Sequence, residues 1–259
     1  MNLIKTAVEK PIKWIGRQRI NRVLNRYDVK FELAKRGANY YDYYWSKAFK
    51  KMDLKTIPYF SDIAAEVIAE KRTFLEYDRL YTFWQAVSNL ESSDLPIAEI
   101  GAYRGGSAKF ILEALKKTNL TNEFYVFDTF EGHAVVDEQV DGPHEVGQFS
   151  ETSYEEVKAY LEAPNVVVHK GDFLETARLI EHISNFGLVH IDVDVYPVTK
   201  FCLEFFGERT IRGSILIIDD YGNNYCKGLK KAVDEYTGAN SQFKMIYLLT
   251  GQALMIKVG

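Results

Sequence analysis

From residue 97 to residue 259, short runs of β-branched and aromatic residues alternate with stretches whose apolar residues have helical spacing. This alternation predicts an α/β fold in which helices cover a mostly parallel sheet. The predicted strands are Ile97–Gly101, Phe124–Asp128, Val166–His169, Gly187–Asp192, Ser214–Asp219, Phe243–Leu249 and Ala253–Val258. Only residues 250–252 separate the last two strands, which is too short for a crossover helix. The sheet is therefore predicted to end in an antiparallel hairpin.

Helices are predicted between and before these strands. The apolar residues after Ser107 have helical spacing, so Ser107 is predicted to be the N-cap of a helix after the first strand. Ile63–Ser88 also has a helical pattern, and a further helix is predicted to begin near Ser153. The segment Glu131–Ser150 is a long loop between the second strand and the helix near Ser153, and such loops are usually functional or disordered. We expect either a substrate lid or a passive flexible insertion.

The beginning of the chain has a different character. Met1–Arg36 contains ten Lys or Arg residues against only Glu9, Asp28 and Glu32, and apolar residues are interleaved with these cations. We predict a helical N-terminal extension, residues 1–62, in front of a domain formed by residues 63–259. The extension either packs on its own domain or on a second subunit, as in a homo-oligomer, or lies on an anionic membrane surface.

Composition and charge limit the class of protein and its expected location in the cell. The chain has 259 residues, 47% of them apolar, which is enough for a sizeable core, and a net charge of -4. No apolar run approaches the length needed to cross a bilayer, and charged residues interrupt the apolar positions at the start of the chain, unlike in a secretory signal. We expect a cytoplasmic protein with reduced Cys202 and Cys226. Peripheral contact with the inner face of the membrane is expected only if the N-terminal extension binds there, and no nucleic-acid partner is expected.

A glycine-rich turn follows the first predicted strand, in the sequence Glu99-Ile-Gly-Ala-Tyr-Arg-Gly-Gly106. Such a turn at a helix N-terminus lets a ligand approach the backbone, which suits a nucleoside. The glycines do not make the G-x-G-x-x-G fingerprint, which argues against NAD and FAD. Asp128, at the end of the second strand, is placed to accept hydrogen bonds from ribose hydroxyls. Asp172, after the third strand, is either a partner of the adenine amino group or an ordinary loop residue.

Acidic residues end two further strands. Asp192 ends the fourth strand and Asp194 lies two residues later, with both side chains expected on the same side of it. Asp219 ends the fifth strand and is followed by Asp220. The carboxyl ends of parallel strands meet at one crevice, and carboxylates gathered there repel one another unless a cation lies between them. We therefore predict a divalent metal site, with Mg²⁺ favoured over Mn²⁺ or Ca²⁺. The alternatives are a helix cap, a turn or solvated loop acids, and His190 is expected to be a packed strand residue.

Four segments together resemble the macrocin O-methyltransferase family: Glu99–Ser107, Phe127–Gly132, Asp192–Asp194 and Asp219–Tyr221. The resemblance extends from about Arg72 to the C-terminus. It implies a Rossmann-like class I methyltransferase fold, S-adenosylmethionine as methyl donor and a hydroxyl of an antibiotic deoxysugar as acceptor. The N-terminal region and the loop from His133 to Gly147 do not match the family strongly. A nucleotide sugar, a polysaccharide or a glycolipid is therefore an equally compatible acceptor.

The resemblance also implies roles for individual residues. Asp192, Asp219 and Asp220 match the metal ligands, and Asp194 matches the general base that takes the proton of the acceptor hydroxyl. The residues expected to bind the cofactor are Glu99, Gly101, Tyr103, Gly105, Ser107, Asp128 and Asp172. Two other functions remain open at this point. One is catechol-type O-methylation with the same donor and a similar metal site, and the other is a non-catalytic scaffold that keeps the methyltransferase fold.

Overall fold

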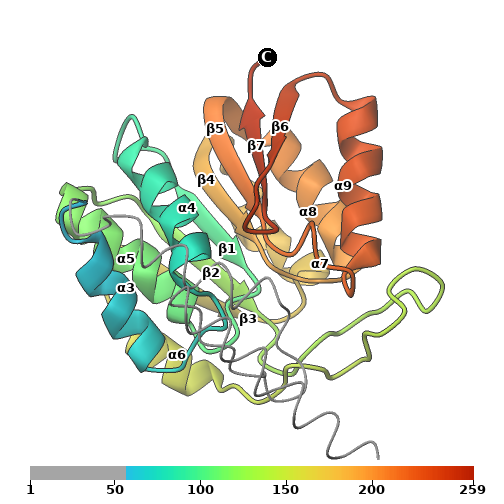
Figure 1. Ribbon diagram of the computed structural model, residues 1–259, viewed down its shortest axis with the longest axis horizontal. Helices are drawn as coiled ribbons and strands as arrows, with labels where there is room; N and C mark the ends of the chain where they lie inside the picture. The colour runs from blue at the N-terminus through green and yellow to red at the C-terminus, as the bar shows by residue number, and fades with distance from the viewer. Residues whose placement is uncertain (1–56) are drawn as a thin grey trace, which may run out of the picture. The chain divides into compact units, whose positions relative to one another are not determined.

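A seven-stranded sheet lies at the centre of the part of the chain that the computed structural model describes, residues 57–259 (Figure 1). The strands follow the order β3-β2-β1-β4-β5-β7-β6. Their bounds are β1 Ile97–Ile100, β2 Phe124–Asp128, β3 Val166–Lys170, β4 Phe186–Ile191, β5 Thr210–Ile218, β6 Phe243–Tyr247 and β7 Ala253–Lys257. The first five strands pair in parallel, whereas β7 is antiparallel to both β5 and β6. The predicted sheet with its terminal hairpin is confirmed.

Helices cover both faces of the sheet. Figure 1 shows α3 to α6 on one side and α7 to α9 on the other. The bounds are α3 Phe60–Ala69, α4 Tyr77–Ser88, α5 Gly106–Thr118, α6 Tyr154–Tyr160, α7 Phe173–Thr176, the short 3-10 helix Ala177–Ile180, α8 Tyr196–Glu208 and α9 Lys227–Ala239. No helix in the described range is long and apolar enough to cross a membrane.

The strands build two separate hydrophobic cores because their side chains alternate between the faces. Leu188 and Ile217 pack with α3, α4 and α5, whereas Val189 and Leu216, one residue away in each strand, pack with α8 and α9. All four of these side chains are fully buried. The central strands are thus apolar on both faces, as expected for a covered parallel sheet.

The structure corrects three details of the helices and strands. The predicted helix Ile63–Ser88 is two helices, α3 and α4, separated by residues 70–76, where Lys71 has a positive φ of 57°. Ser107 is not an N-cap, since α5 begins at Gly106 and its N-cap is Gly105 with a φ of 82°, a conformation that favours glycine. Strand β5 begins at Thr210, four residues before the predicted start at Ser214. Its pairing with β4 shifts register there, and exposed residues 211–213 interrupt the apolar pattern on which the prediction depended. The helix predicted to begin near Ser153 is α6, and the Ser153 side chain caps it by accepting a hydrogen bond from the Glu156 amide.

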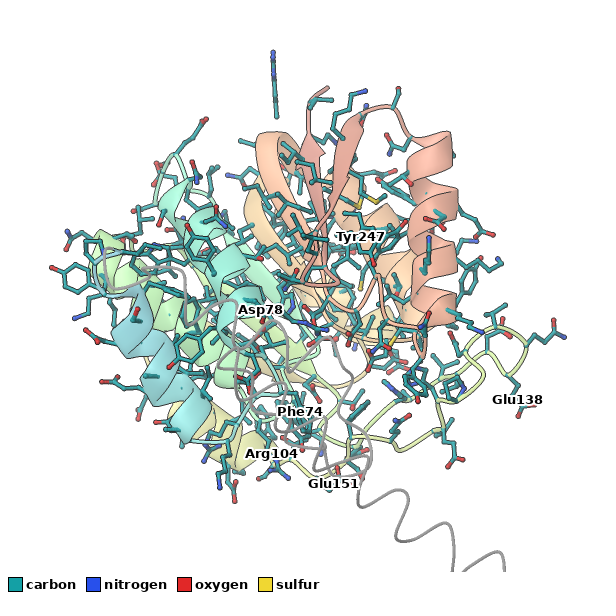
Figure 2. All side chains as sticks on the ribbon, viewed as in Figure 1. Phe74, Asp78, Arg104, Glu138, Glu151 and Tyr247 are labelled. Carbon is teal, nitrogen blue, oxygen red and sulfur yellow. The ribbon has the colours of Figure 1, made fainter. Side chains whose placement is uncertain are left out.

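The long loop between β2 and α6 contains only turns and bends, yet it is anchored. Figure 2 shows Glu138 at its outer end, away from the sheet. Further along, buried Asp141 accepts hydrogen bonds from the amide of Asp137 at 2.8 Å and from the amide of Tyr196, the first residue of α8, also at 2.8 Å. Closer to β2, the His133 amide donates to the Gln148 carbonyl at 3.0 Å. These contacts argue against a passive flexible insertion, and the substrate lid stays a prediction.

The predicted N-terminal extension lies almost entirely outside the described residues, and its basic amphipathic segment lies wholly outside them. The boundary at residues 62 and 63, the homo-oligomer and the membrane contact all stay predictions. Helix α3 begins at Phe60, three residues before the predicted domain start.

Candidate active site

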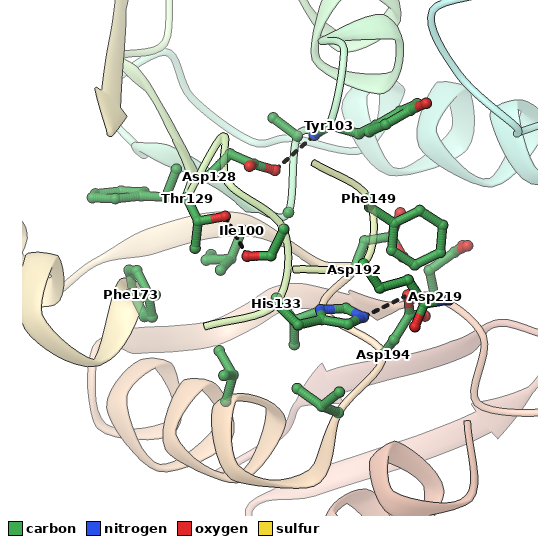
Figure 3. Close-up of a pocket in the computed structure, with 18 of the residues that line it drawn as sticks. Ile100, Tyr103, Asp128, Thr129, His133, Phe149, Phe173, Asp192, Asp194 and Asp219 are labelled. Carbon is green, nitrogen blue, oxygen red and sulfur yellow. Dashed lines mark hydrogen bonds and ion pairs between the residues drawn. The ribbon is translucent and has the colours of Figure 1, made fainter. Parts of the chain in front are cut away.

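A pocket opens where the carboxyl ends of β1, β2, β4 and β5 meet. It encloses about 1060 Å³ of empty space, a volume that includes the open solvent at its mouth. Figure 3 shows Tyr103 and Asp128 at one end and His133, Asp192, Asp194 and Asp219 at the other. The parallel strands thus bring the predicted glycine turn and the predicted acid cluster into one cavity.

The glycines of the turn allow backbone segments to pack closely. A Cβ atom on Gly101 would lie 1.8 Å from the carbonyl oxygen of Asp192, and Gly101 has a φ of 92°. A Cβ atom on Gly106 would lie 2.8 Å from the backbone of Arg72. Gly105 caps α5 beside Val157 and does not line the pocket. Glycine is therefore required at residue 101 by the contact between the segments after β1 and β4, a reason that the sequence pattern alone did not give.

Asp128 joins the end of β2 to the glycine turn. Its carboxylate accepts hydrogen bonds from the amide of Tyr103 at 2.8 Å and from the amide of Phe130 at 2.6 Å. Burial raises the pKa of the Asp128 carboxyl, whereas these backbone donors oppose the rise. Asp128 lines the pocket, where its carboxylate is in the position expected for a ribose partner.

An aromatic rim borders this end of the pocket. The rings of Phe74 and Tyr103 are stacked with centroids 5.3 Å apart, and Phe149 meets Tyr103 edge-on at 6.2 Å. Arg104 lies over the Tyr103 ring and donates to the carbonyl of Glu151 at 2.7 Å. Three segments form this rim: the break before α4, the glycine turn and the long loop. Phe74 is 75% exposed, which leaves its ring available to a ligand.

The other predicted cofactor residues divide into two groups. Ser107 and Asp172 line the pocket, but the Asp172 side chain also caps α7 by accepting from the Leu174 amide at 3.0 Å. Glu99 does not line the pocket. Its side chain is fully buried on the opposite side of β1, with an oxygen 2.8 Å from Nδ1 of His190. Glu99 is therefore corrected to a core residue, and His190 is the packed strand histidine that was expected.

The three predicted metal ligands lie together. Asp192, Asp219 and Asp220 each offer an oxygen, and these oxygens lie within 4.8 Å of one another. Burial, followed by the charge of Asp219, raises the pKa of Asp192 well above its ordinary value. Burial and the charge of Asp219 also raise the pKa of Asp220. The arrangement concentrates negative charge in a desolvated place, as a cation site does.

Arg79, which sequence analysis missed, already compensates part of this charge. From α4 it forms an ion pair with Asp219 through Nη1, and its Nη2 lies 2.9 Å from Asp220. The charge of Asp219 is the main reason why the pKa of Arg79 is raised. Gln252, in the hairpin before β7, donates to the other oxygen of Asp219 at 2.7 Å. The only hint in the sequence was a cation within the amphipathic pattern of α4.

Asp194 has different neighbours. Strand β4 ends at Ile191, so Asp192 and Asp194 lie beyond the strand, and a turn in which Asp194 has a φ of 60° replaces the expected strand alternation. The thiol of Cys226 donates to Oδ1 of Asp194 at 3.3 Å, and Nε2 of His133 lies 3.9 Å from Oδ2. Burial and the charge of Asp220 raise the pKa of Asp194 to about 6. At neutral pH the carboxylate is therefore mostly ionised but basic enough to accept a proton.

Comparison with known proteins agrees with this geometry. The family model described as macrocin-O-methyltransferase (TylF) matches residues 67–247. The chain is 28% identical over 188 residues to the 8-demethyl-8-(2,3-dimethoxy-alpha-L-rhamnosyl)-tetracenomycin-C 4'-O-methyltransferase of Streptomyces olivaceus, covering 64% of this chain and 67% of that protein.

Solved structures share the fold. CalS11, a calicheamicin methyltransferase, has a TM-score of 0.61 at 18% identity, over 86% of this chain and 95% of that one. The O-methyltransferase NovP has a TM-score of 0.57 at 23% identity, over 72% of this chain and 82% of that one. These likenesses establish the class I methyltransferase fold. Since the family model covers well over half of the chain, including the glycine turn and all six aspartates that line the pocket, the chain belongs to the macrocin-O-methyltransferase family of S-adenosylmethionine-dependent O-methyltransferases.

Proposed function

We propose that this enzyme transfers the methyl group of S-adenosylmethionine to a hydroxyl of a sugar, with the help of a divalent cation. The observation that carries the proposal is the single pocket that holds Asp128 and the glycine turn at one end and the four aspartates at the other. The relative from Streptomyces olivaceus is named for methylation of a rhamnosyl group, and a second CalS11 structure is described as a TDP-rhamnose 3'-O-methyltransferase. Both names support a sugar acceptor.

The donor occupies the end of the pocket near Asp128 in this proposal. Asp128 accepts hydrogen bonds from the ribose hydroxyls, Tyr103 and Phe74 supply aromatic surface, and Asp172 lies on the adenine side. Calorimetry is expected to show binding of S-adenosylmethionine and of its demethylated product, but not of NAD. Asp128→Asn is expected to weaken donor binding, whereas Glu138→Gln, at the exposed outer end of the loop, serves as the control. Tight NAD binding without donor binding would contradict the assignment.

The residues at the other end fit a divalent cation. Asp192, Asp219 and Asp220 offer only oxygen donors, the set that Mg²⁺ prefers, and their oxygens are already gathered. Arg79 is bonded to one oxygen of Asp219 and one of Asp220, and Gln252 is bonded to the other oxygen of Asp219. The carboxylate of Asp192 and the second oxygen of Asp220 are bonded to neither of these side chains. When bound, a divalent cation would polarise the acceptor hydroxyl and lower its pKa.

The protein's own residues supply the proton transfer and the alignment. Asp194 takes the proton of the acceptor hydroxyl while the hydroxyl oxygen bonds to the methyl carbon and the carbon–sulfur bond breaks. The sulfonium thereby becomes a neutral thioether. The thiol of Cys226 holds one oxygen of Asp194, which leaves the other oxygen directed toward His133 and the pocket. A positioned base of this kind typically contributes about 10² to 10⁴ in rate.

The cation assignment is tested by Asp192→Ala and Asp219→Ala. Either variant should lose metal-dependent methylation and keep donor binding, because these carboxylates lie at the acceptor end of the pocket. Glu181→Ala removes an exposed acid that does not line the pocket and is a matched loss of one charge. Full methylation activity of the wild type in excess chelator would exclude the metal from the mechanism.

A further inference from the structure

A second group of potential metal ligands lies beside the carboxylates but differs from them chemically. His133, His144 and Asp194 each offer one ligand atom, and these atoms lie within 4.8 Å of one another. The two imidazole rings meet nearly edge-on, with centroids 5.4 Å apart. Both histidines come from the long loop, whereas Asp194 follows β4. The three side chains therefore converge from two segments that are distant in sequence.

The histidine nitrogens that face this gap are buried and unpartnered. Nε2 of His133 and Nε2 of His144 have essentially no exposed surface and no hydrogen-bond partner among the described residues. His144 as a whole is 9% exposed. Buried polar atoms are normally satisfied, because leaving them unpaired costs free energy. Two such atoms at one gap, beside a carboxylate, indicate a missing partner.

The hydrogen bonds of His144 prepare it as a ligand. Its Nδ1 lies 3.1 Å from Oε1 of Gln148, and the amide of Glu145 donates to the same oxygen at 3.3 Å. Because a backbone amide can only donate, Oε1 is the acceptor, and Nδ1 of His144 carries the hydrogen. Nε2, which is buried and has no hydrogen-bond partner among the described residues, then carries a lone pair and no hydrogen. Metal-binding histidines commonly donate their other N–H to an oxygen in this way.

We propose that His133, His144 and Asp194 form a binding site for a borderline transition-metal ion such as Zn²⁺, separate from the carboxylate site. Two imidazole nitrogens and one carboxylate oxygen suit Zn²⁺, Co²⁺ or Ni²⁺, whereas Mg²⁺ prefers the all-oxygen set of Asp192, Asp219 and Asp220.

Occupation of this site has a consequence that rests on the proposed function. The ion would use the oxygen of Asp194 that otherwise accepts the proton of the acceptor hydroxyl. It would also fasten the long loop to the segment after β4, since both histidines belong to that loop. The site therefore acts as an inhibitory one, at which Zn²⁺ opposes the reaction that Mg²⁺ supports.

Binding is tested on the full-length protein after removal of metals and in excess Mg²⁺, which fills the carboxylate site. We expect calorimetry to show that the wild type binds Zn²⁺. The affinity for Zn²⁺ should fall at least about tenfold in His133→Ala and in His144→Ala, because each variant loses one ligand. Asp192→Ala should retain the wild-type affinity. His182→Ala removes an exposed histidine and is the matched control. Co²⁺ should give visible absorption bands in the wild type that both histidine variants lose.

Folding of each variant is checked by its affinity for S-adenosylmethionine, and His144→Gln provides a second, more conservative substitution. Absence of Zn²⁺ binding in the wild type, or equal binding in all histidine variants, would overturn the site. Loss of binding in Asp192→Ala but not in His144→Ala would assign the ion to the carboxylates instead. Zn²⁺ bound at the histidines without slowing methyl transfer would overturn the inhibitory role. A protein that methylates nothing would refute the proposed function, and the binding result would still decide the site.

Discussion

Asp194 differs from the other pocket acids in its neighbours. Asp219 and Asp220 are paired with Arg79, whereas Asp194 is bonded to the neutral thiol of Cys226 and faces His133. Burial, more than any other cause, holds the Cys226 thiol protonated by raising its pKa. No cation among these contacts neutralises Asp194, so its carboxylate keeps the basicity that proton transfer needs.

The substitution Asp194→Asn removes this basicity and changes the shape of the side chain little. We expect the turnover rate to fall by about 10² to 10⁴, the usual contribution of a general base. Donor affinity and Mg²⁺ binding should stay close to those of the wild type, because neither is assigned to Asp194. Initial rates with radiolabelled donor, together with calorimetry, measure the three quantities. An Asn variant as fast as the wild type would assign the base elsewhere.

Glu99 shows how a motif residue can have a structural task. It lies in the glycine-turn segment, yet its carboxylate is buried against His190 behind the pocket. We expect Glu99→Gln to lower the free energy of unfolding by about 1–3 kcal/mol, because the change disturbs a buried hydrogen-bonded pair. Donor affinity should change little. Denaturant unfolding and calorimetry test this, and a large loss of donor affinity at unchanged stability would return Glu99 to the cofactor site.

At the scale of elements, the strand ends were predictable and the helix contacts were not. The rule that parallel strands end at one crevice placed Asp192 and Asp219 together from the sequence alone. Arg79 reaches the same place from α4, and its contact with Asp219 spans 140 residues of sequence. Helical periodicity gives the buried face of α4, but not which pocket residue a side chain at the edge of that face will meet. The roles of Cys226 and Gln252 were also missed, because their contacts with Asp194 and Asp219 join segments that are distant in sequence.

Arg79→Ala is expected to destabilise the protein unless a metal replaces the lost charge. Asp219 is 1% exposed, and removing one partner of such a buried pair typically costs about 3–5 kcal/mol. Mg²⁺ should therefore raise the thermal unfolding midpoint more in this variant than in the wild type. Arg178→Ala, which removes an exposed arginine, is the control. Equal responses of the two variants to Mg²⁺ would show that a cation does not replace the charge of Arg79.

At the scale of the whole molecule, the sheet and its hairpin followed from hydrophobic patterning because burial on both faces leaves a strong signal in the strands. The break at residues 70–76 carries no such signal, and neither does the packing of the long loop. Both depend on contacts with distant segments: the backbone of Arg72 lies against Gly106, and Asp141 binds the first turn of α8. These two segments are also the ones that shape the rim and floor of the pocket around the family motifs.

The N-terminal extension is tested by deleting residues 1–26. We expect the deletion to convert an oligomer to a smaller species, because the apolar positions of this segment suit packing on a second subunit. Sedimentation velocity measures the change in mass. The opposing result is binding of the full-length protein to anionic vesicles at low salt, release as salt rises, and loss of that binding on deletion. That outcome would assign the segment to the membrane surface.

The most direct test of metal-assisted sugar methylation is transfer of a deuterated methyl group from S-adenosylmethionine, followed by mass spectrometry. The acceptors are rhamnosyl nucleotide sugars, rhamnosylated glycans and catechols, each assayed with Mg²⁺ and with excess chelator. The label should appear on a sugar hydroxyl, disappear with chelator and return when Mg²⁺ is restored. Label on catechols but on no sugar, or label on a sugar at an unchanged rate in chelator, would contradict the proposed reaction.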